Sequence, residues 1–304
     1  MWTRWAKLAI IFLAVVITTV ACQSLRQSRG PNLTERPEGA VRLATYNVHY
    51  IAMRADSGLW SKTMWGRRKA PLDRTIKAIG ADIIAFQEME TFQGGDDDSV
   101  NLARDWLLQQ NPKYKAAATG DWRVFPSTQP VLYRRDKFEV LDQGWFFFSD
   151  TPDVIYSRTF NGSYPAFASW VRFRNRADGG AFRVVNVHTD YASLGNRRKS
   201  MALVAARIRP WIDAGETVFL AGDLNARLGS GLLETLETVG LAFAPVQGAT
   251  YHFDRGLNLF GAIDHLGFSG RVRLVGAPMV FRDKLGDVWP TDHYPVVADF
   301  VLGQ

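Results

Sequence analysis

Polar side chains that could bind a metal ion and a phosphate group follow short apolar runs in this chain. The clearest motif is Gly222-Asp223-Leu224-Asn225, which comes directly after the apolar run 217–221. A carboxylate and an amide at a strand end offer hard oxygen ligands, which suit a divalent cation or a phosphate oxygen. Strand-end Asp and Asn are also common turn residues, so this motif alone leaves a plain turn open.

The same pattern recurs along the chain. The polar residues that border the other apolar runs are Asn47, Glu88, His188, Asp264 with His265, and Asp292 with His293. Six strand ends that offer amide, carboxylate and imidazole groups predict one assembled site. Taken singly, each has a simpler explanation, such as a turn Asn or a structural histidine.

Phosphoester hydrolysis requires a bound metal, neutralised phosphate oxygens and an activated water. Glu88 follows a continuous apolar run and is the predicted principal metal ligand. Asn47 could bind the metal or a phosphate oxygen. Asp223 and Asn225 lie two residues apart, which places them on one face of an extended strand. One of them could orient the attacking water while the other contacts a phosphate oxygen.

Six ordered segments resemble the endonuclease/exonuclease/phosphatase superfamily of metal-dependent phosphodiesterases, which have a deoxyribonuclease-I-like fold. They are ATYNV, DIIAFQE, VVNVHTD, LAGDLNAR, AIDHLGF and TDHYPV, and they extend over nearly all of residues 41–304. The resemblance implies an α/β fold, a four-layer α/β/β/α sandwich of two mostly antiparallel sheets with helices outside. It also implies that the strand ends converge on one edge between the sheets.

The resemblance further implies the roles of the site residues. The expected catalytic residues are His188, Asp223, Asn225, Asp264 and His293, and the expected metal ligands are Asn47, Glu88 and Asp292. The oxygen ligands favour Mg²⁺ or Mn²⁺ as the cofactor. Asp264 is the expected partner of His293, because a carboxylate on one imidazole nitrogen fixes the tautomer and raises the pKa.

The other histidines have expected roles too, and one role stays open. His49 and His265 are expected to be structural, and His252 is expected in a loop near the rim of the site. Family nucleases often have a glutamate that orients the first histidine. The corresponding stretch 126–133 contains no carboxylate, which leaves the protonation role of His188 open.

The apolar periodicity predicts few helices and many strands. Helical spacing occurs over 73–79, 100–108 and 197–212, while 131–133 and 138–140 are predicted to form paired strands. The aromatic stretch Phe146-Phe147-Phe148 is predicted as a core strand rather than a membrane-inserting hairpin. This distribution predicts two packed sheets with helices outside.

The first residues predict export to the bacterial envelope. A basic region with Arg4 and Lys7 precedes an apolar stretch over 8–20, and the sole cysteine, Cys22, follows it. Residues 1–22 therefore resemble a lipoprotein signal, 23–39 a flexible tether and 40–304 the catalytic domain. Thr19 stands where a lipoprotein signal usually has Leu, so a plain secretory signal or an uncleaved signal anchor stays open. The expected product is a monomer anchored on the periplasmic side of the membrane.

Amino-acid composition limits the possible substrates and partners less than the site motifs do. The chain is 47% apolar with a formal charge of +6, and without Arg4 and Lys7 it keeps 34 basic and 30 acidic residues, a charge of +4. Such an excess suits an anionic phosphoester substrate, but it is also ordinary for a soluble domain. Nucleic acid, a phospholipid head group and a small phosphate ester all remain open as substrates, because the fold accepts them all. The alternative function is a non-catalytic lipid- or partner-binding module.

Overall fold

The computed structural model describes residues 4–92 and 100–303, so residues 1–3 of the predicted signal and residue 304 lie outside it. Its helices are α1 (Arg4–Gln27), α2 (Lys62–Ile79), α3 (Leu102–Gln110), α4 (Leu194–Asp213) and α5 (Glu234–Glu237). Its strands are β1 (Val41–Asn47), β2 (Ile51–Ala52), β3 (Ile83–Gln87), β4 (Thr91–Phe92), β5 (Tyr114–Ala117), β6 (Val131–Arg134), β7 (Phe138–Phe147), β8 (Phe167–Asn175), β9 (Ala181–His188), β10 (Thr217–Asp223), β11 (Ala242–Phe243), β12 (Asp264–Ser269), β13 (Val272–Val280) and β14 (Val296–Leu302).

Two six-stranded sheets form the centre of the domain. Their strand orders are β13-β14-β1-β3-β6-β5 and β11-β12-β10-β9-β8-β7. Each sheet has one parallel pair at its centre, β1 with β3 and β9 with β10, and its other neighbours are antiparallel. The short strands β2 and β4 pair separately. The prediction of two mostly antiparallel sheets is therefore confirmed.

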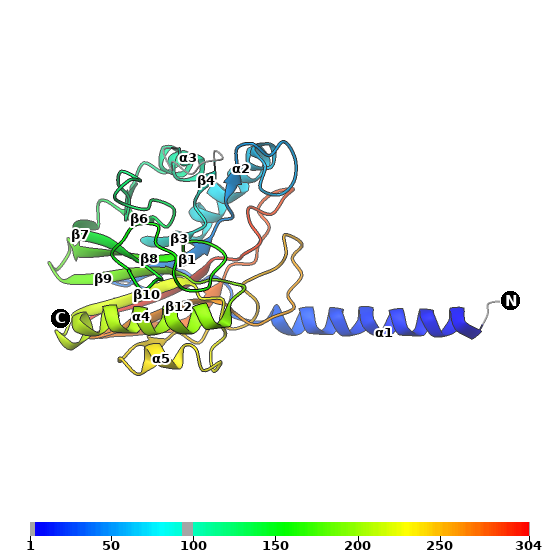
Figure 1. Cartoon of the computed structure of the whole chain (residues 1–304). Coiled ribbons are helices and arrows are strands. Elements are labelled where there is room, and N and C mark those ends of the chain that lie inside the picture. Colours follow the sequence, from blue (N-terminus) through cyan, green and yellow to red (C-terminus); the bar gives the residue numbers. More distant parts are fainter. Residues whose placement is uncertain (1–3, 93–99, 304) are drawn as a thin grey trace.

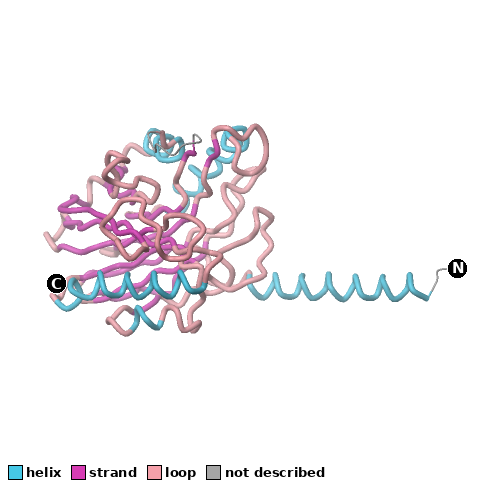
Figure 2. Tube along the Cα trace, in the orientation of Figure 1, coloured by secondary structure: helices cyan, strands magenta, loops and turns pink. Residues whose placement is uncertain are grey.

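Three apolar clusters hold the layers together. The first lies between the sheets and includes Leu43 and Ile83 from one sheet and Phe182 and Phe219 from the other. The second joins the β9–β10 sheet to α4 and α5, and the third joins the β1–β3 sheet to α2 and α3. Helices consequently cover both outer faces of the paired sheets, as Figures 1 and 2 show. This is the predicted α/β/β/α order.

Strand alternation directs the site residues between the sheets. On β1, Leu43 belongs to the cluster between the sheets and Ala44 to the cluster beneath the helices. Side chains of a strand alternate between faces, so Asn47 shares the inner face with Leu43. The same alternation places His188 on the face of Phe182 and Asp223 on the face of Phe219. The carboxyl ends of both parallel pairs thus bring polar side chains to one edge of the sandwich.

α2 and α4 are longer than the periodicity predicted, whereas α3 has the predicted length and begins two residues later. Ser61 caps α2, because its hydroxyl accepts the backbone N–H of Met64, and Gly80 ends the helix in the left-handed conformation with φ 55°. The predicted helix 73–79 is therefore the last part of α2, which continues through Pro71. Asn101 and Ser193 cap α3 and α4 in the same way.

The predicted pairing of 131–133 with 138–140 is wrong. β6 pairs with β3 and β5 in the first sheet, whereas β7 pairs with β8 in the second. The connection 135–137 therefore carries the chain from one sheet to the other instead of closing a hairpin. Phe146, Phe147 and Phe148 are buried, which confirms that this stretch belongs to the core.

The N-terminal segment forms a helix that projects from the domain (Figure 1). α1 has no buried residue, and it is long and apolar enough to cross a membrane, a property that a signal sequence shares. Residues after Cys22 contact the domain: Gln23 Nε2 donates to the Leu259 carbonyl at 2.9 Å, and Arg36 Nη1 lies 2.6 Å from Asp82 Oδ1. In the structure the predicted tether 23–39 packs on the domain at these points.

Gly222, in the middle of the GDLN motif, allows β10 to approach β9. A Cβ atom at this position would lie 1.9 Å from the Val187 carbonyl oxygen. We expect Gly222→Ala to lower the free energy of unfolding by about 1–3 kcal/mol, because the two strands must separate. The measurement is a denaturant titration of the detergent-solubilised chain.

Gly66 provides the matched control for this substitution. It is exposed within α2, and a Cβ there would meet nothing within 4 Å. Gly66→Ala should raise stability by about 0.5–1 kcal/mol, because alanine restricts the unfolded chain and favours the helix. Equal effects of the two substitutions would contradict the packing argument.

Candidate active site

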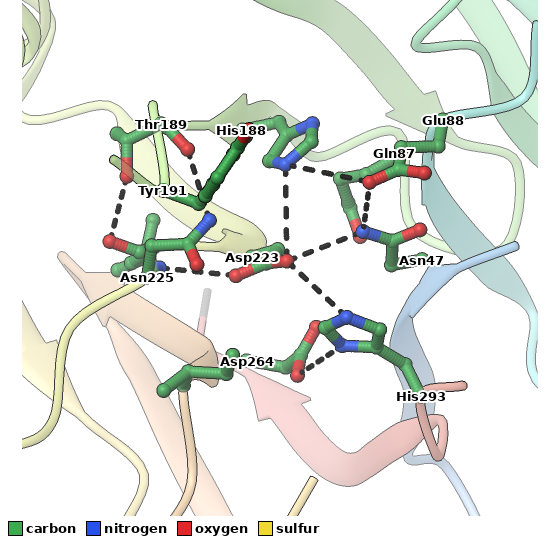
Figure 3. A network of polar contacts seen from close by, with 12 residues as sticks. Asn47, Gln87, Glu88, His188, Thr189, Tyr191, Asp223, Asn225, Asp264 and His293 are labelled. Carbon is green, nitrogen blue, oxygen red and sulfur yellow. Dashed lines mark hydrogen bonds and ion pairs between the residues drawn. The ribbon is translucent and has the colours of Figure 1, made fainter. Parts of the chain in front are cut away.

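Asn47, Glu88, His188 and Asp223 meet at the edge where the two parallel strand pairs end (Figure 3). Asn47 Nδ2 donates to Glu88 Oε1 at 3.1 Å and to Asp223 Oδ2 at 3.2 Å. His188 Nε2 lies 3.9 Å from Glu88 Oε1 and 3.8 Å from Asp223 Oδ2. One sheet supplies Asn47 and Glu88 and the other supplies His188 and Asp223, so the site spans the junction of both sheets.

Asp264 and His293 form a buried pair on the other side of Asp223. His293 Nδ1 lies 3.0 Å from Asp264 Oδ2, and its Nε2 lies 3.7 Å from Asp223 Oδ2. Burial disfavours the charged ring, but the Asp264 and Asp223 carboxylates outweigh it and hold the pKa of His293 well above its ordinary value. His293 can therefore keep a proton for a phosphate oxygen at neutral pH.

Asp223 is the carboxylate at the centre of this network. Burial and the nearby charge of Asp264 raise the pKa of Asp223 to about 6, although His293 and His188 oppose this rise. A carboxylate whose pKa lies near neutrality exchanges protons more readily than an ordinary aspartate. Asp223 is thus suited to accept a proton from a water molecule.

Two site residues reach the site through left-handed turns rather than strand alternation. Glu88 follows the last residue of β3 and has a φ of 53°, and Asn225 follows β10 with a φ of 44°. The expectation that Asn225 shares a face with Asp223 on an extended strand is wrong, because β10 ends at Asp223. Instead the Asn225 N–H donates to Asp223 Oδ1 at 3.0 Å, and Asn225 Nδ2 donates to the Thr189 carbonyl at 2.9 Å.

Asp292 lies at the same edge, where it pairs with His49. His49 Nδ1 lies 3.2 Å from Asp292 Oδ1, and the hydroxyl of Thr291 donates to the Asn47 carbonyl at 3.0 Å. Burial alone would raise the pKa of Asp292, but the His49 hydrogen bond and the His293 charge lower it below its ordinary range. Asp292 therefore stays ionised, and His49 contacts a predicted metal ligand. Nothing in the sequence pattern pointed to this contact.

The sequence also missed Arg68, which supports the loop after β1. Its guanidinium donates to the carbonyls of Val48, His49 and Tyr50 and to that of Pro290. Burial lowers the pKa of Arg68 to about 10, which leaves it charged at neutral pH. A single buried cation thus ties the segment after Asn47 to the segment before Asp292. Arg68 stands in the basic run 67–69, before the predicted helix 73–79, and nothing in that run indicated this role.

The remaining histidines have structural surroundings. His265 Nε2 lies 2.8 Å from the Ala226 carbonyl. His252 is buried and stacks on Tyr294 with ring centroids 4.1 Å apart, and its burial lowers the pKa to about 4. His252 is therefore a packed neutral ring; it lies in a loop as predicted, but it is fully buried rather than at the rim of the site.

A cavity of about 570 Å³ opens beside Glu88 and His188. Aromatic side chains form much of its wall: Tyr50, Tyr156, Tyr164, Phe167 and Tyr191. The Tyr164 ring lies 5.5 Å from the His188 ring between centroids. Among the residues that line this cavity there is no lysine or arginine. Its charged lining residues are the carboxylates Glu88 and Glu90, so the cavity suits a group without negative charge next to His188.

The Asp264–His293 pair makes a prediction that needs neither metal nor substrate. In Asp264→Asn the ring loses its neighbouring negative charge, so the pKa of His293 should fall towards an ordinary value. An NMR titration of the His293 ring in excess chelator would measure this. Asp178→Asn, at an exposed turn, should leave the titration unchanged. An identical His293 titration in Asp264→Asn and the unsubstituted chain would refute the electrostatic role of Asp264.

Comparisons with known proteins agree with this geometry. No curated protein matches the sequence. Among solved structures, an endonuclease/exonuclease/phosphatase from Bacteroides vulgatus is 26% identical with a TM-score of 0.71, covering 87% of this chain and 99% of that one. A mannosyl-6-phosphatase from Bacteroides thetaiotaomicron is 21% identical with a TM-score of 0.72, covering 86% and 100%. The human Nocturnin catalytic domain is 14% identical with a TM-score of 0.62, covering 88% and 97%.

The family model of the endonuclease/exonuclease/phosphatase family matches residues 44–293, a range that begins three residues before Asn47 and ends at His293. The match therefore includes every predicted site residue. The chain belongs to the endonuclease/exonuclease/phosphatase family.

Proposed function

We propose that this protein is a divalent-metal-dependent hydrolase of phosphoester bonds. The observation that supports it best is the charge balance of the site. Glu88, Asp223, Asp264 and Asp292 are four carboxylates at one edge, and within residues 4–92 and 100–303 their ion-pair partners are all histidines. An anionic phosphate would be repelled by such a site unless a cation compensated these charges.

The residues fit a hard divalent cation. Asp223, Asp264 and His293 offer ligand atoms within 4.8 Å of one another, but Asp264 already holds His293 Nδ1. The cation is therefore placed beside them, where Asn47 joins Glu88 and Asp223. The Glu88 carboxylate remains about one quarter exposed beside them. We assign Glu88, with Asn47 and Asp292, as ligands of Mg²⁺ or Mn²⁺, because oxygen donors without cysteine suit these ions. When bound, such a cation neutralises phosphate charge and acidifies water.

The remaining residues act on the phosphate and the water. Asp223, whose pKa is raised to about 6, orients the water and accepts its proton. His293 donates a hydrogen bond to a phosphate oxygen, and Asp264 fixes its tautomer. His188 provides the second imidazole contact. The Asn225 side chain, held by the Thr189 carbonyl, completes the polar wall beside Asp223.

A non-catalytic lipid- or partner-binding module is the alternative function. It would bind a phosphoester at the same edge without turning it over. The intact Asp264–His293 pair and the raised pKa of Asp223 favour the enzyme, because a binding module does not need a proton acceptor at this point. Binding without turnover of any phosphoester would support the module instead.

We also propose that the protein acts as a monomer on the periplasmic side of a bacterial membrane. α1 and the exposed Cys22 support this location, because either an uncleaved helix or a lipid on Cys22 would hold the domain at the bilayer. Two acyl chains on a cysteine give stable anchoring without a spanning helix.

Glu88→Gln tests the metal-dependent reaction. It keeps the size of the side chain but removes the charge of the proposed principal ligand, so kcat/KM should fall at least about 100-fold. The assay is hydrolysis of bis-p-nitrophenyl phosphate and p-nitrophenyl phosphate with Mg²⁺, Mn²⁺ or excess chelator. Glu139→Gln, an exposed residue paired with Arg174, serves as the control and should keep full activity. Undiminished turnover in chelator would exclude the metal mechanism.

Cys22→Ser tests the anchor. If Cys22 is lipidated, the substitution should block processing and leave a longer chain, which mass spectrometry of the membrane fraction would detect. The unsubstituted chain should carry a lipid on an N-terminal Cys22. An unmodified cysteine, or a mature N-terminus at another residue, would reject the lipoprotein assignment while the hydrolase proposal would stand.

A further inference from the structure

Exposed apolar side chains gather at the edge of the sandwich that contains the site. Outside α1, the large hydrophobic residues that are exposed within the described ranges number eight: Leu59, Trp60, Val124, Val154, Tyr156, Tyr191, Leu194 and Phe260. All of them lie in connections that leave or enter a strand at the site end, or at the first residue of α4. We call this set the apolar rim.

The opposite edge of the sandwich has a different character. Its connections are 80–82, 111–113, 135–137, 176–180, 214–216, 238–241 and 270–271, and none of the eight exposed residues lies in them. Charged residues occur at both edges, such as Lys137 here and Arg123 at the site end. Isolated exposed apolar residues are normal on a protein surface, but their confinement to one edge marks an interaction surface.

The C-terminal end of α1 contacts this same edge. Asn258 donates through its backbone N–H to Ser24 Oγ at 3.1 Å, and Ala249 N–H donates to the Gln27 carbonyl at 2.7 Å. Gln23 contacts Leu259, the neighbour of Phe260, which is half exposed. Figure 1 shows α1 leaving the domain on the side where these loops lie. The helix has polar residues at both ends, is largely apolar over residues 8–22, and has no buried residue.

Both possible anchors place the bilayer at this edge. If α1 stays uncleaved, its apolar part enters the membrane directly before the residues that contact the domain. If Cys22 is lipidated, the lipid enters the membrane next to Gln23. The apolar rim would then face the membrane surface in either case. Trp60 and Tyr191 are suited to this position, because aromatic rings favour the membrane–water interface.

We propose that the apolar rim rests on the bilayer that holds the protein and that the site hydrolyses the phosphoester head group of a lipid in that bilayer. This inference rests on the proposed hydrolase function. The cavity beside Glu88 and His188 supports it, because its aromatic wall, with the carboxylates of Glu88 and Glu90 and no lysine or arginine among its described lining residues, suits a head-group moiety without negative charge rather than a polyanion. Water attacks phosphorus, an ester bond to the lipid or to its head group breaks, and the leaving oxygen takes a proton.

The position of the rim can be measured on the full chain in phosphatidylcholine–phosphatidylglycerol nanodiscs. Cys22 is the sole cysteine, so a Cys22→Ser background allows single spin labels at Leu59→Cys and Phe260→Cys, with Asp178→Cys at the opposite edge as control. We expect the two rim labels to be more accessible to oxygen than to a nickel chelate, and the control label to show the reverse. Rim labels as water-exposed as the control would overturn the inference.

The substrate is tested with the double substitution Leu59→Ser and Phe260→Ser, against Arg135→Ser at the opposite edge. The rim variant should hydrolyse nanodisc phosphatidylglycerol about tenfold more slowly, because two apolar anchors are lost, and should keep its rate on soluble bis-p-nitrophenyl phosphate. Equal lipid rates for the two variants would overturn the inference, as would a protein that turns over the soluble ester but no lipid. Absence of turnover on both substrates would instead refute the hydrolase function, and the spin labels would still test the surface.

Discussion

A buried hydrogen bond between two side-chain amides joins the sheets directly beneath the site. Gln87 at the end of β3 donates through Nε2 to Asn186 Oδ1 of β9 at 2.7 Å, and Thr45 Oγ1 on β1 donates to Gln87 Oε1 at 3.2 Å. Asn186 in turn donates to the Phe86 carbonyl at 2.7 Å. Amides buried between apolar sheets must be satisfied, so a slip of either sheet would leave polar atoms unpaired. This constraint fixes the sheets at the junction where the proposed catalytic groups meet.

The site above this amide pair combines strand alternation with left-handed turns. Asn47, His188 and Asp223 point between the sheets because they share a strand face with core residues. Glu88 would point the other way by the same alternation, since its neighbour Gln87 already faces inward. A φ of 53° turns its carboxylate back to Asn47. Such a conformation is costly for a residue with a side chain, and its recurrence at His49 and Asn225 marks the edge as a functional site.

The sequence predicted the location of the site better than its detailed geometry. Apolar runs that end in polar residues are local patterns, and the order of six such runs predicted which side chains would converge. The pairing of 131–133 with 138–140 failed because strand partners depend on which sheet can bury each apolar face, which is a property of the whole fold. The turn at Asn225, the His49–Asp292 contact and the Arg68 support involve loops, where no periodicity constrains the chain. The Gln87–Asn186 bond was equally invisible, because its residues lie about 100 positions apart.

The distribution of positive charge around the site bears on which phosphoesters it could attract. Two arginines beside the site donate to backbone carbonyls: Arg68 to four of them, and Arg197 to those of Asp190 and Tyr191. In the proposed function, positive charge for a phosphate comes from protonated His293 and from a bound cation, both of which act at short range. Long-range attraction of a polyanion needs an extended basic groove, which the aromatic cavity lacks. A site of this kind would gain most from a substrate delivered by its surroundings, which is what the proposed contact between the apolar rim and the bilayer would provide.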